Sequence, residues 1–382
     1  MMFQFIWIGT EPFKVLWLLL RTKWYKFNIT IKSLFYNYFL DQNYVADVLM
    51  EPIFYFVDNF TKVLGPFFII AASGLTISVV VICYMIGLPY WWRRSPEVTV
   101  VLVIIGHWLL INIVFHYYMG CTVSPGLPPE GALIPEAVSI CKKCIAPKPP
   151  RTHHCSICNK CILKMDHHCP WLNNCVGHYN HRYFFMYMVY MTLGTIFIIV
   201  CGVELAYDVV YIGKSFDSDG EEELIGHPVR FNDSIMIPVT EGETKGMDNK
   251  KWQRGCIIYI ALICTGVLIA LGSLALWHGR LITRGETSIE GNINKTETKR
   301  YALQNKVYIN PYNFGPAKNW KLFLGLVDGR SWIHLVFPSA HKPPGNGLTW
   351  KTVYSNDDDE EGELNEHNYT LNSDENNGSK IK

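Results

Sequence analysis

The chain lacks an excess of charge of either sign. Lys and Arg number 34 and Asp and Glu number 33, so the formal net charge is +1 over 382 residues. Bulk charge therefore gives no indication of an acidic partner, and we expect no nucleic acid to bind. The sequence also lacks an internal repeat and a glycine-rich phosphate loop, which argues against repeat folds and against P-loop nucleotide binding.

The first twenty residues lack the pattern of a secretory signal peptide. Glu11 and Pro12 interrupt the apolar run there, and no basic residue precedes it. The residues that follow mix aromatic and cationic side chains, which favours a segment lying at a membrane surface. A fifth membrane segment within residues 1–20 is the alternative.

Long apolar runs are what the chain has in abundance, and hydrophobic residues make up 49% of it. Four segments each hold the roughly 20 apolar residues that span a bilayer as a helix. They cover residues 65–88, 98–118, 183–203 and 256–277. We therefore predict an all-α membrane protein with four transmembrane helices.

The charges of the connecting segments predict an orientation. Segment 121–182 is basic, whereas the 211–254 loop is acidic through Asp217, Asp219 and Glu221 to Glu223. The positive-inside tendency places the basic segment in the cytosol, and four spans then place both termini there as well. Two arginines in the short first loop, Arg93 and Arg94, run against this pattern.

Cysteine and histidine gather in one short segment. Residues 141–175 contain seven cysteines and four histidines. Two Cys-x2-Cys pairs begin at Cys141 and Cys155, a spacing that presents two thiolates to one metal ion. Two tetrahedral zinc sites need eight ligands, which six cysteines and two histidines supply. His154 and His168, each directly before a cysteine, can provide the nitrogens.

The thiol that this count leaves over is assigned to Cys169, which ends the run Asp166-His167-His168-Cys169. A carboxylate can orient an imidazole, and the imidazole can take the proton of a nearby thiol and leave a nucleophilic thiolate. The alternatives are a disulfide framework and a structural zinc module such as a membrane-anchored RING-like adaptor. An odd cysteine count and the paired Cys-x2-Cys units disfavour disulfides, and this run favours chemistry over a scaffold.

Segment 141–180, CKKCIAPKPPRTHHCSICNKCILKMDHHCPWLNNCVGHYN, is similar to the cysteine-rich domain of the DHHC protein S-acyltransferases, the palmitoyltransferases that acylate protein cysteines. Thr287-Ser288-Ile289-Glu290 resembles the family's Thr-Thr-x-Glu motif, with Ser in place of the second Thr. Segment 310–315, NPYNFG, followed by Asn319, resembles the C-terminal motif whose asparagine seats the tail against the membrane core. With HYNHRYFF, these segments resemble the sixteenth-numbered animal member in particular.

One motif departs from the family pattern. The Asp-Pro-Gly usual after the second helix is here Ser124-Pro125-Gly126, so any role of that aspartate is in doubt while the turn chemistry of Pro-Gly is retained.

The resemblance implies a small cytosolic zinc domain between helices 2 and 3. Its two structural zinc ions would have interleaved ligands, Cys141, Cys144, His154 and Cys161 for one and Cys155, Cys158, His168 and Cys175 for the other. The resemblance also implies that Cys169 is the nucleophile, His167 the general base and Asp166 the group that fixes its tautomer.

The implied reaction transfers a fatty acyl group from palmitoyl-CoA, or another long-chain acyl-CoA, through S-acyl-Cys169 to cytosolic cysteines of membrane-associated proteins. Trp171 is expected to border the first methylenes of the chain or to act as an interfacial anchor. Basic residues of the segment can meet CoA phosphates or the headgroups of membrane lipids: Lys148, Arg151, Lys160, Lys164 and Arg182. Residence in the endoplasmic reticulum or Golgi follows from the resemblance alone.

The expected organisation has six parts. They are a cytosolic or interfacial N-terminal region 1–64, helices 1 and 2 in 65–120, the zinc domain in 121–182, helices 3 and 4 with a lumenal loop in 183–278, a cytosolic C-terminal domain 279–350 and an acidic, disordered tail 351–382. A non-catalytic zinc scaffold that recruits partners to the membrane is the competing function, and a metal transporter is the third.

Overall fold

The computed structural model describes residues 11–36, 42–131, 134, 137–212, 215–216, 222–223, 241–327 and 329–355. The acidic residues 217–221 of the predicted lumenal loop and most of the predicted tail lie outside the described residues. By its internal contacts the chain divides into an N-terminal unit, Met1–Val63, and a main unit, Leu64–Lys382.

The N-terminal unit contains helix α1 (Glu11–Tyr36) and the beginning of helix α2 (Gln42–Ile82). Helix α1 exposes apolar and aromatic side chains, and Arg21 lies over the ring of Trp17 at 5.2 Å from its centroid. The boundary predicted at residue 64 falls inside α2, because that helix already begins at Gln42.

The four predicted membrane spans are confirmed. Among the described residues, four helical segments are long and apolar enough to cross a bilayer, namely Met50–Arg94, Pro96–Thr122, His181–Ile212 and Asn249–Thr283. They are built from α2 with η1 (Cys83–Gly87) and α3 (Leu88–Arg94), from α4 (Pro96–Thr122), from α5 (His181–Ala206) with η3 (Tyr207–Ile212), and from the second part of α6 (Glu241–Thr283).

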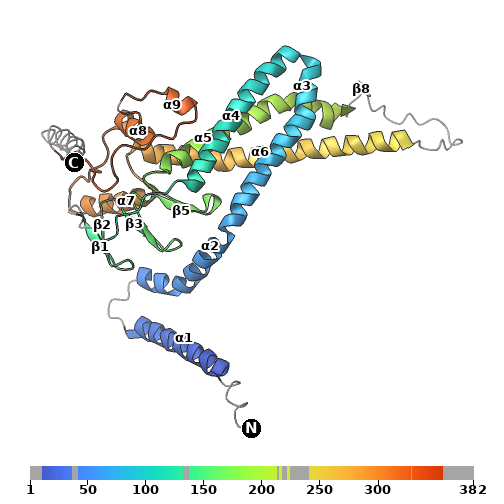
Figure 1. Cartoon of the computed structure of the whole chain (residues 1–382). Coiled ribbons are helices and arrows are strands. Elements are labelled where there is room, and N and C mark those ends of the chain that lie inside the picture. The colour runs from blue at the N-terminus through green and yellow to red at the C-terminus, as the bar shows by residue number, and fades with distance from the viewer. Residues whose placement is uncertain are drawn as a thin grey trace, which may run out of the picture. The chain divides into compact units, whose positions relative to one another are not determined.

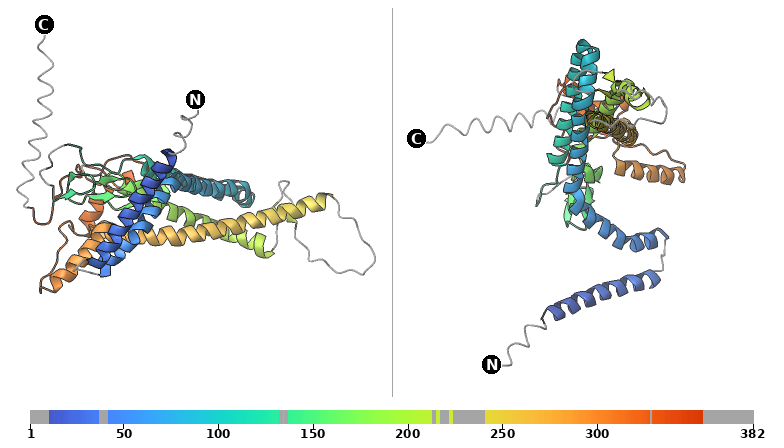
Figure 2. Two further views of the ribbon diagram at one scale, coloured as in Figure 1. Left: turned by 90° about the horizontal axis from the view of Figure 1, so that it is seen from below. Right: turned by 90° about the vertical axis from the view of Figure 1, so that its right-hand side faces the viewer.

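The spans pack through small residues and apolar contacts. Helix α4 starts where Ser95 caps it by accepting a hydrogen bond from the Val98 N–H, with Pro96 in its first turn. Gly194 of α5 lets the Ile113 side chain of α4 approach to 3.0 Å from where a Cβ would lie. Helix α5 packs against both α4 and α6, and its place beside them can be followed in Figures 1 and 2.

The cysteine-rich domain consists of three two-stranded antiparallel hairpins rather than helices. They pair β1 (Ser139–Cys141) with β2 (Ala146–Lys148), β3 (His153–Cys155) with β4 (Lys160–Ile162), and β5 (His167–Cys169) with β6 (Asn174–Val176). A further short pair, β7 (Ser215–Phe216) and β8 (Glu222–Glu223), lies between α5 and α6. The membrane part is thus helical, as predicted, and the small domain adds β structure.

The register of the hairpins brings the predicted ligands together. His154 of β3 lies directly opposite Cys161 of β4, and His168 of β5 lies opposite Cys175 of β6. Directly opposed residues of an antiparallel pair have their Cβ atoms only about 5 Å apart. The second and third hairpins therefore each present one imidazole and one thiol to the same place.

The turn that replaces Asp-Pro-Gly connects the domain to the end of α4. The carbonyl of Pro125 accepts a hydrogen bond from the Tyr179 N–H, and that of Gly126 accepts one from the Leu163 N–H. Gly126 has φ of +100°, and the Tyr179 ring lies 3.0 Å from the position of a Cβ, so the turn requires glycine.

The C-terminal part forms helices α7 (Ser288–Ala302), α8 (Pro316–Leu324) and α9 (Ile333–Val336). Together with the hairpins they gather at one end of α4, α5 and α6 (Figure 1). Asn319 holds this part in place, because its amide donates to the carbonyl of Thr283, the last residue of α6. This contact agrees with the seating role that the resemblance implies for Asn319.

Candidate functional site

The first group of four ligand side chains lies between the first two hairpins. The sulfur atoms of Cys141 and Cys144 are 3.6 and 3.2 Å from His154 Nδ1, and the sulfur of Cys161 is 3.8 Å from that of Cys144. The Cys144 N–H donates to the Cys141 sulfur, and this bond lowers the pKa of the Cys141 thiol to about 7. The turn thus favours a thiolate where a metal ligand needs one.

The second group lies between the second and third hairpins and repeats this arrangement. His168 Nδ1 is 3.8, 3.4 and 3.5 Å from the sulfur atoms of Cys155, Cys158 and Cys175. The Cys158 N–H again donates to the first sulfur of the pair, that of Cys155. The two groups are interleaved along the chain, because Cys155 and Cys158 come before Cys161.

Both groups fit tetrahedral zinc. With Zn–S bonds of about 2.3 Å and Zn–N bonds of about 2.0 Å, tetrahedral geometry requires S···S separations of about 3.8 Å and S···N separations of about 3.5 Å. The observed separations run from 3.2 to 3.8 Å. No disulfide occurs among the cysteines that the structure describes, and all eight side chains are free to bind metal.

Cys169 belongs to neither group of four. It is buried, and it lines a large cavity together with His167 and Trp171. The Cys169 thiol is therefore separate from the two candidate metal-binding groups, although His168 is its immediate neighbour in the chain. Strand β5 explains this separation, because successive side chains point to opposite faces of a strand.

His167 is held by Asp166 and lies beside Cys169. Its Nδ1–H donates to Asp166 Oδ2 at 2.6 Å, which leaves Nε2 as the basic nitrogen. Burial disfavours the charged ring, but the hydrogen bonds and charges of Asp166 and Cys169 outweigh burial and raise the pKa of His167 to about 9. His167 is consequently a stronger base than an ordinary histidine.

Asp166 is held in its charged form at the start of helix α7. The N–H of Ser288 donates to Oδ1 and its hydroxyl donates to Oδ2, each at 2.7 Å. Although burial opposes ionisation, the neighbouring His181 and His167 keep the pKa of Asp166 well below its usual range. The N-terminal end of a helix also favours a carboxylate. The sequence did not indicate this role of Ser288, which lies 122 positions away from Asp166.

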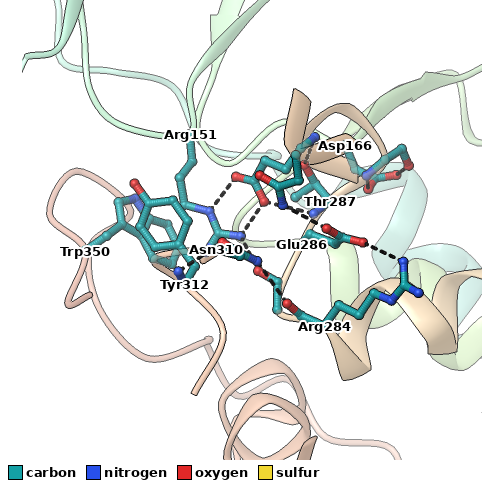
Figure 3. A network of polar contacts seen from close by, with 12 residues as sticks. Arg151, Asp166, Arg284, Glu286, Thr287, Asn310, Tyr312 and Trp350 are labelled. Carbon is teal, nitrogen blue, oxygen red and sulfur yellow. Dashed lines mark hydrogen bonds and ion pairs between the residues drawn. The ribbon is translucent and has the colours of Figure 1, made fainter. Parts of the chain in front are cut away.

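An ion pair connects the same helix to the cysteine-rich domain. Arg151 donates from Nε and Nη2 to the two carboxylate oxygens of Glu290, both at 2.6 Å. Glu290 also completes a capping box with Thr287 at the start of α7. Figure 3 shows Arg151 reaching toward Tyr312 and Trp350, whose ring centroids lie 4.3 and 4.7 Å from its guanidinium carbon.

Two of the basic residues expected to meet CoA phosphates or lipid headgroups have internal partners instead. Arg151 pairs with Glu290, and only 6% of its side chain is exposed. Arg182 is buried and donates to the carbonyls of Ser339 and His341. Burial of a guanidinium requires such partners, so neither side chain is free to bind an external phosphate.

The cavity beside Cys169 has a volume of about 940 Å³ and lies among the membrane-spanning segments. Most of its lining is apolar, and His167 and Cys169 line it at the end nearest the cysteine-rich domain. Trp171 lines it too but is 52% exposed, and its ring lies 4.8 Å from that of Phe68. The cavity is of a size that holds one long apolar ligand with its reactive end at Cys169.

Comparison with known proteins agrees with this geometry. The family model "DHHC palmitoyltransferase" matches residues 135–295. Palmitoyltransferase ZDHHC16B of Danio rerio is 42% identical over 341 residues, which cover 86% of this chain and 88% of that protein. Palmitoyltransferase ZDHHC16 of Homo sapiens is 42% identical over 334 residues, which cover 86% of each chain. The chain belongs to the DHHC palmitoyltransferase family.

Family membership confirms the resemblance inferred from the motifs, including the sixteenth-numbered animal member, whose number both relatives carry. This member of the DHHC family is therefore an enzyme, a protein S-palmitoyltransferase of the multi-pass membrane type. A non-catalytic zinc scaffold is not supported as its main function.

Two buried histidines close to the site of this DHHC palmitoyltransferase were missed in the sequence. His181 is the first residue of α5, and His278 lies near the end of α6. The centroids of their two rings are 5.9 Å apart. The ring of His278 is also 5.9 Å from that of His167. A lone histidine near a helix end carries no local signal, because only packing of α5 against α6 brings these rings together.

Proposed function

We propose that Cys169 carries the acyl group, that His167 moves the proton and that Asp166 fixes the tautomer of His167. The observation that supports this most strongly is the placement of the Asp166–His167 pair and Cys169 at one end of the large apolar cavity. A base with a raised pKa beside a thiol at the mouth of a chain-sized cavity suits acyl transfer from a thioester.

The reaction proceeds by two thioester exchanges. His167 takes the proton of the Cys169 thiol, and the thiolate attacks the carbonyl carbon of the acyl-CoA. The carbon–sulfur bond to CoA breaks, and the CoA thiolate leaves with the proton that His167 returns. In the second exchange the thiol of a substrate protein gives its proton to His167 and attacks S-acyl-Cys169, which frees the Cys169 thiol.

The cavity binds the fatty chain of the donor. Burial of a chain contributes about 0.8 kcal/mol for each methylene, so palmitoyl-CoA or another long-chain acyl-CoA gains affinity from a deep apolar cavity. Trp171, half exposed at the boundary of the cavity, borders the first methylenes. The polar CoA part stays in water on the side of the cysteine-rich domain.

Each group of four Cys and His ligands holds one structural zinc ion. With four protein ligands, neither ion has an open position for substrate. When bound, zinc contributes folding free energy to a domain that has only short hairpins. The ligand set of the second ion includes His168, so this site also fixes β5, the strand that carries His167 and Cys169.

The protein substrates are membrane-associated proteins with cytosolic cysteines. The basic segment 121–182 supports a cytosolic position of the site, since positive loops stay on that side of the membrane. Lys160 is exposed and Lys148 is partly exposed, so both can contact membrane lipids. Residence in the endoplasmic reticulum or Golgi is proposed from the family resemblance.

Incubation of the purified full-length enzyme with labelled palmitoyl-CoA tests the assignment. A hydroxylamine-sensitive label should appear on the wild type and be absent from Cys169→Ser. The matched control is Cys121→Ser, which removes another thiol close to the cysteine-rich domain and should keep the label. If Cys169→Ser carried as much label as the wild type, another residue would have to carry the acyl group.

A further inference from the structure

Behind the pair of Asp166 and His167 lies a third group of metal-binding side chains. It consists of Asp166, His181 and His278, which come from the segment before β5, from the start of α5 and from the end of α6. All three are buried, with 1%, 5% and 1% of their surface exposed. One ligand atom from each lies within 4.8 Å of the others.

The two histidines of this group have polar atoms without partners. Within the part of the chain that the structure describes, both ring nitrogens of His181 lack a hydrogen-bond partner. Nδ1 of His278 lacks one as well. His181 Nε2 lies 3.9 Å from Asp166 Oδ1, which is too long for a hydrogen bond. An unpaired buried polar group is unfavourable, so nitrogens of this kind that also lie beside a carboxylate are candidates to hold a ligand.

In the described structure, the close ring neighbours of His181 are aromatic. Its ring packs edge-on against the aromatic rings of Phe323 and His278, with centroids 5.0 and 5.9 Å away. Asp166 already accepts three hydrogen bonds, from His167 and from the N–H and hydroxyl of Ser288. A carboxylate has about four acceptor positions, so one remains for a further ligand.

We propose that Asp166, His181 and His278 form a third metal site, which binds Zn²⁺. Two imidazoles and one carboxylate are a donor set that zinc accepts, and three protein ligands leave an open fourth position. This site differs from the two structural sites, which have three thiolates and one imidazole each. Its ligands lack thiolate, so it binds zinc more weakly and can exchange it.

The third zinc ion regulates the enzyme, and this part rests on the proposed roles of Asp166 and His167. The ion and His167 bind the same carboxylate, so a dication at this site competes with the hydrogen bond from His167 Nδ1 to Asp166 Oδ2. The ring of His167 is then held less firmly in the orientation that faces Cys169. Zinc at this site therefore slows acylation of Cys169 reversibly.

Metal stoichiometry of the full-length protein tests the site without any need for activity. The Cys169→Ser protein is used, so that zinc cannot bind the nucleophile, and free Zn²⁺ is set with a metal buffer. The bound zinc should rise from two to three per chain. His181→Phe and His278→Phe, each added to Cys169→Ser, should stay at two, and the two retained ions show that either variant is folded.

The matched control is His116→Phe. His116 is also buried in a membrane span and has two nitrogens without partners, but it belongs to no ligand group among the described residues. This variant should still reach three zinc ions. Stoichiometry that stays at two in Cys169→Ser, or a third ion that persists in both His181→Phe and His278→Phe, overturns the site.

The effect on rate is measured with labelled palmitoyl-CoA. Saturating the third site should slow acylation of Cys169 by at least about tenfold, a part of the contribution of a general base. The same free Zn²⁺ should change the rate of His181→Phe by less than about twofold. Equal inhibition of both proteins overturns the regulatory role. A total absence of acylation in protein that holds only its two structural zinc ions contradicts the proposed function and leaves the stoichiometry result valid.

Discussion

Ser288 donates two hydrogen bonds to Asp166, one from its N–H to Oδ1 and one from its hydroxyl to Oδ2, both 2.7 Å long. They connect the first residue of α7 to the residue before His167. The C-terminal part of the chain therefore helps to position a carboxylate of the cysteine-rich domain. The same helix is fixed from the other side by Arg151 and Glu290.

Ser288→Ala should slow acylation because it removes the hydroxyl bond to Asp166. A hydrogen bond to a charged group contributes about 1.5–3 kcal/mol, so kcat/KM should fall by roughly 10- to 100-fold. Ser288→Thr, which restores the residue usual in the family, keeps a hydroxyl and should stay close to wild type. An unchanged rate in Ser288→Ala, measured with two zinc ions bound, would show that Asp166 does not need this bond.

Glu290→Gln should destabilise the protein strongly. The Arg151–Glu290 pair is nearly buried, with 6% and 11% of the side chains exposed, and loss of one partner leaves an uncompensated charge. The expected loss of unfolding free energy is about 3–5 kcal/mol. The control is Glu297→Gln, whose partner Arg300 is 62% exposed, and its effect should stay within about 1 kcal/mol. Denaturant unfolding of both variants in the same detergent distinguishes them.

The Arg151–Glu290 pair also predicts a dependence of stability on pH. Burial opposes the ionisation of Glu290, but Arg151 lowers its pKa below the ordinary value. The unfolded chain then binds a proton more readily than the native one as pH falls below about 4.3. The contribution of the pair is therefore complete above that pH and is lost at lower pH. Glu290→Gln should show a shallower loss of stability in acid, and equal slopes would contradict the assignment.

Substitution of a zinc ligand and substitution of the nucleophile should have different effects on zinc content and on the acyl intermediate. Cys158→Ala should lose one zinc ion and destabilise the cysteine-rich domain, because structural zinc contributes folding free energy. Cys169→Ser should keep both structural ions and lose only the acyl intermediate, since its sulfur lies outside both ligand groups. Zinc content and expression level of the two variants are measured side by side. Loss of an ion in Cys169→Ser would mean that its thiol binds metal.

Substitutions of the two adjacent histidines, His167 and His168, should also differ in their effects on zinc content and acylation rate. His167→Ala should keep both structural ions and slow acylation by about 10²- to 10⁴-fold, the usual contribution of a general base. Higher pH should restore part of the rate, because hydroxide then generates the Cys169 thiolate. His168→Ala should lose zinc, and alkaline pH should not rescue it. If His167→Ala lost zinc and His168→Ala kept it, the roles assigned to the two histidines would have to be exchanged.

Much of this architecture could be predicted from local sequence. An apolar run of membrane length must form a helix in lipid, so composition alone identified the four spans. The Cys-x2-Cys pairs act in the same local way, because a tight turn already places two sulfur atoms on one metal. The hairpin register then adds one opposed imidazole and thiol, as with His154 and Cys161.

Tertiary structure alone decided which polar groups share a partner. Ser288 meets Asp166 across 122 positions of sequence, and Arg151 meets Glu290 across 139. His181 and His278 converge on the same carboxylate only because α5 packs against α6. Local sequence determines helix, turn and ligand spacing through short-range geometry. Contacts between distant segments depend on how all the segments pack at once, and no single segment contains that information.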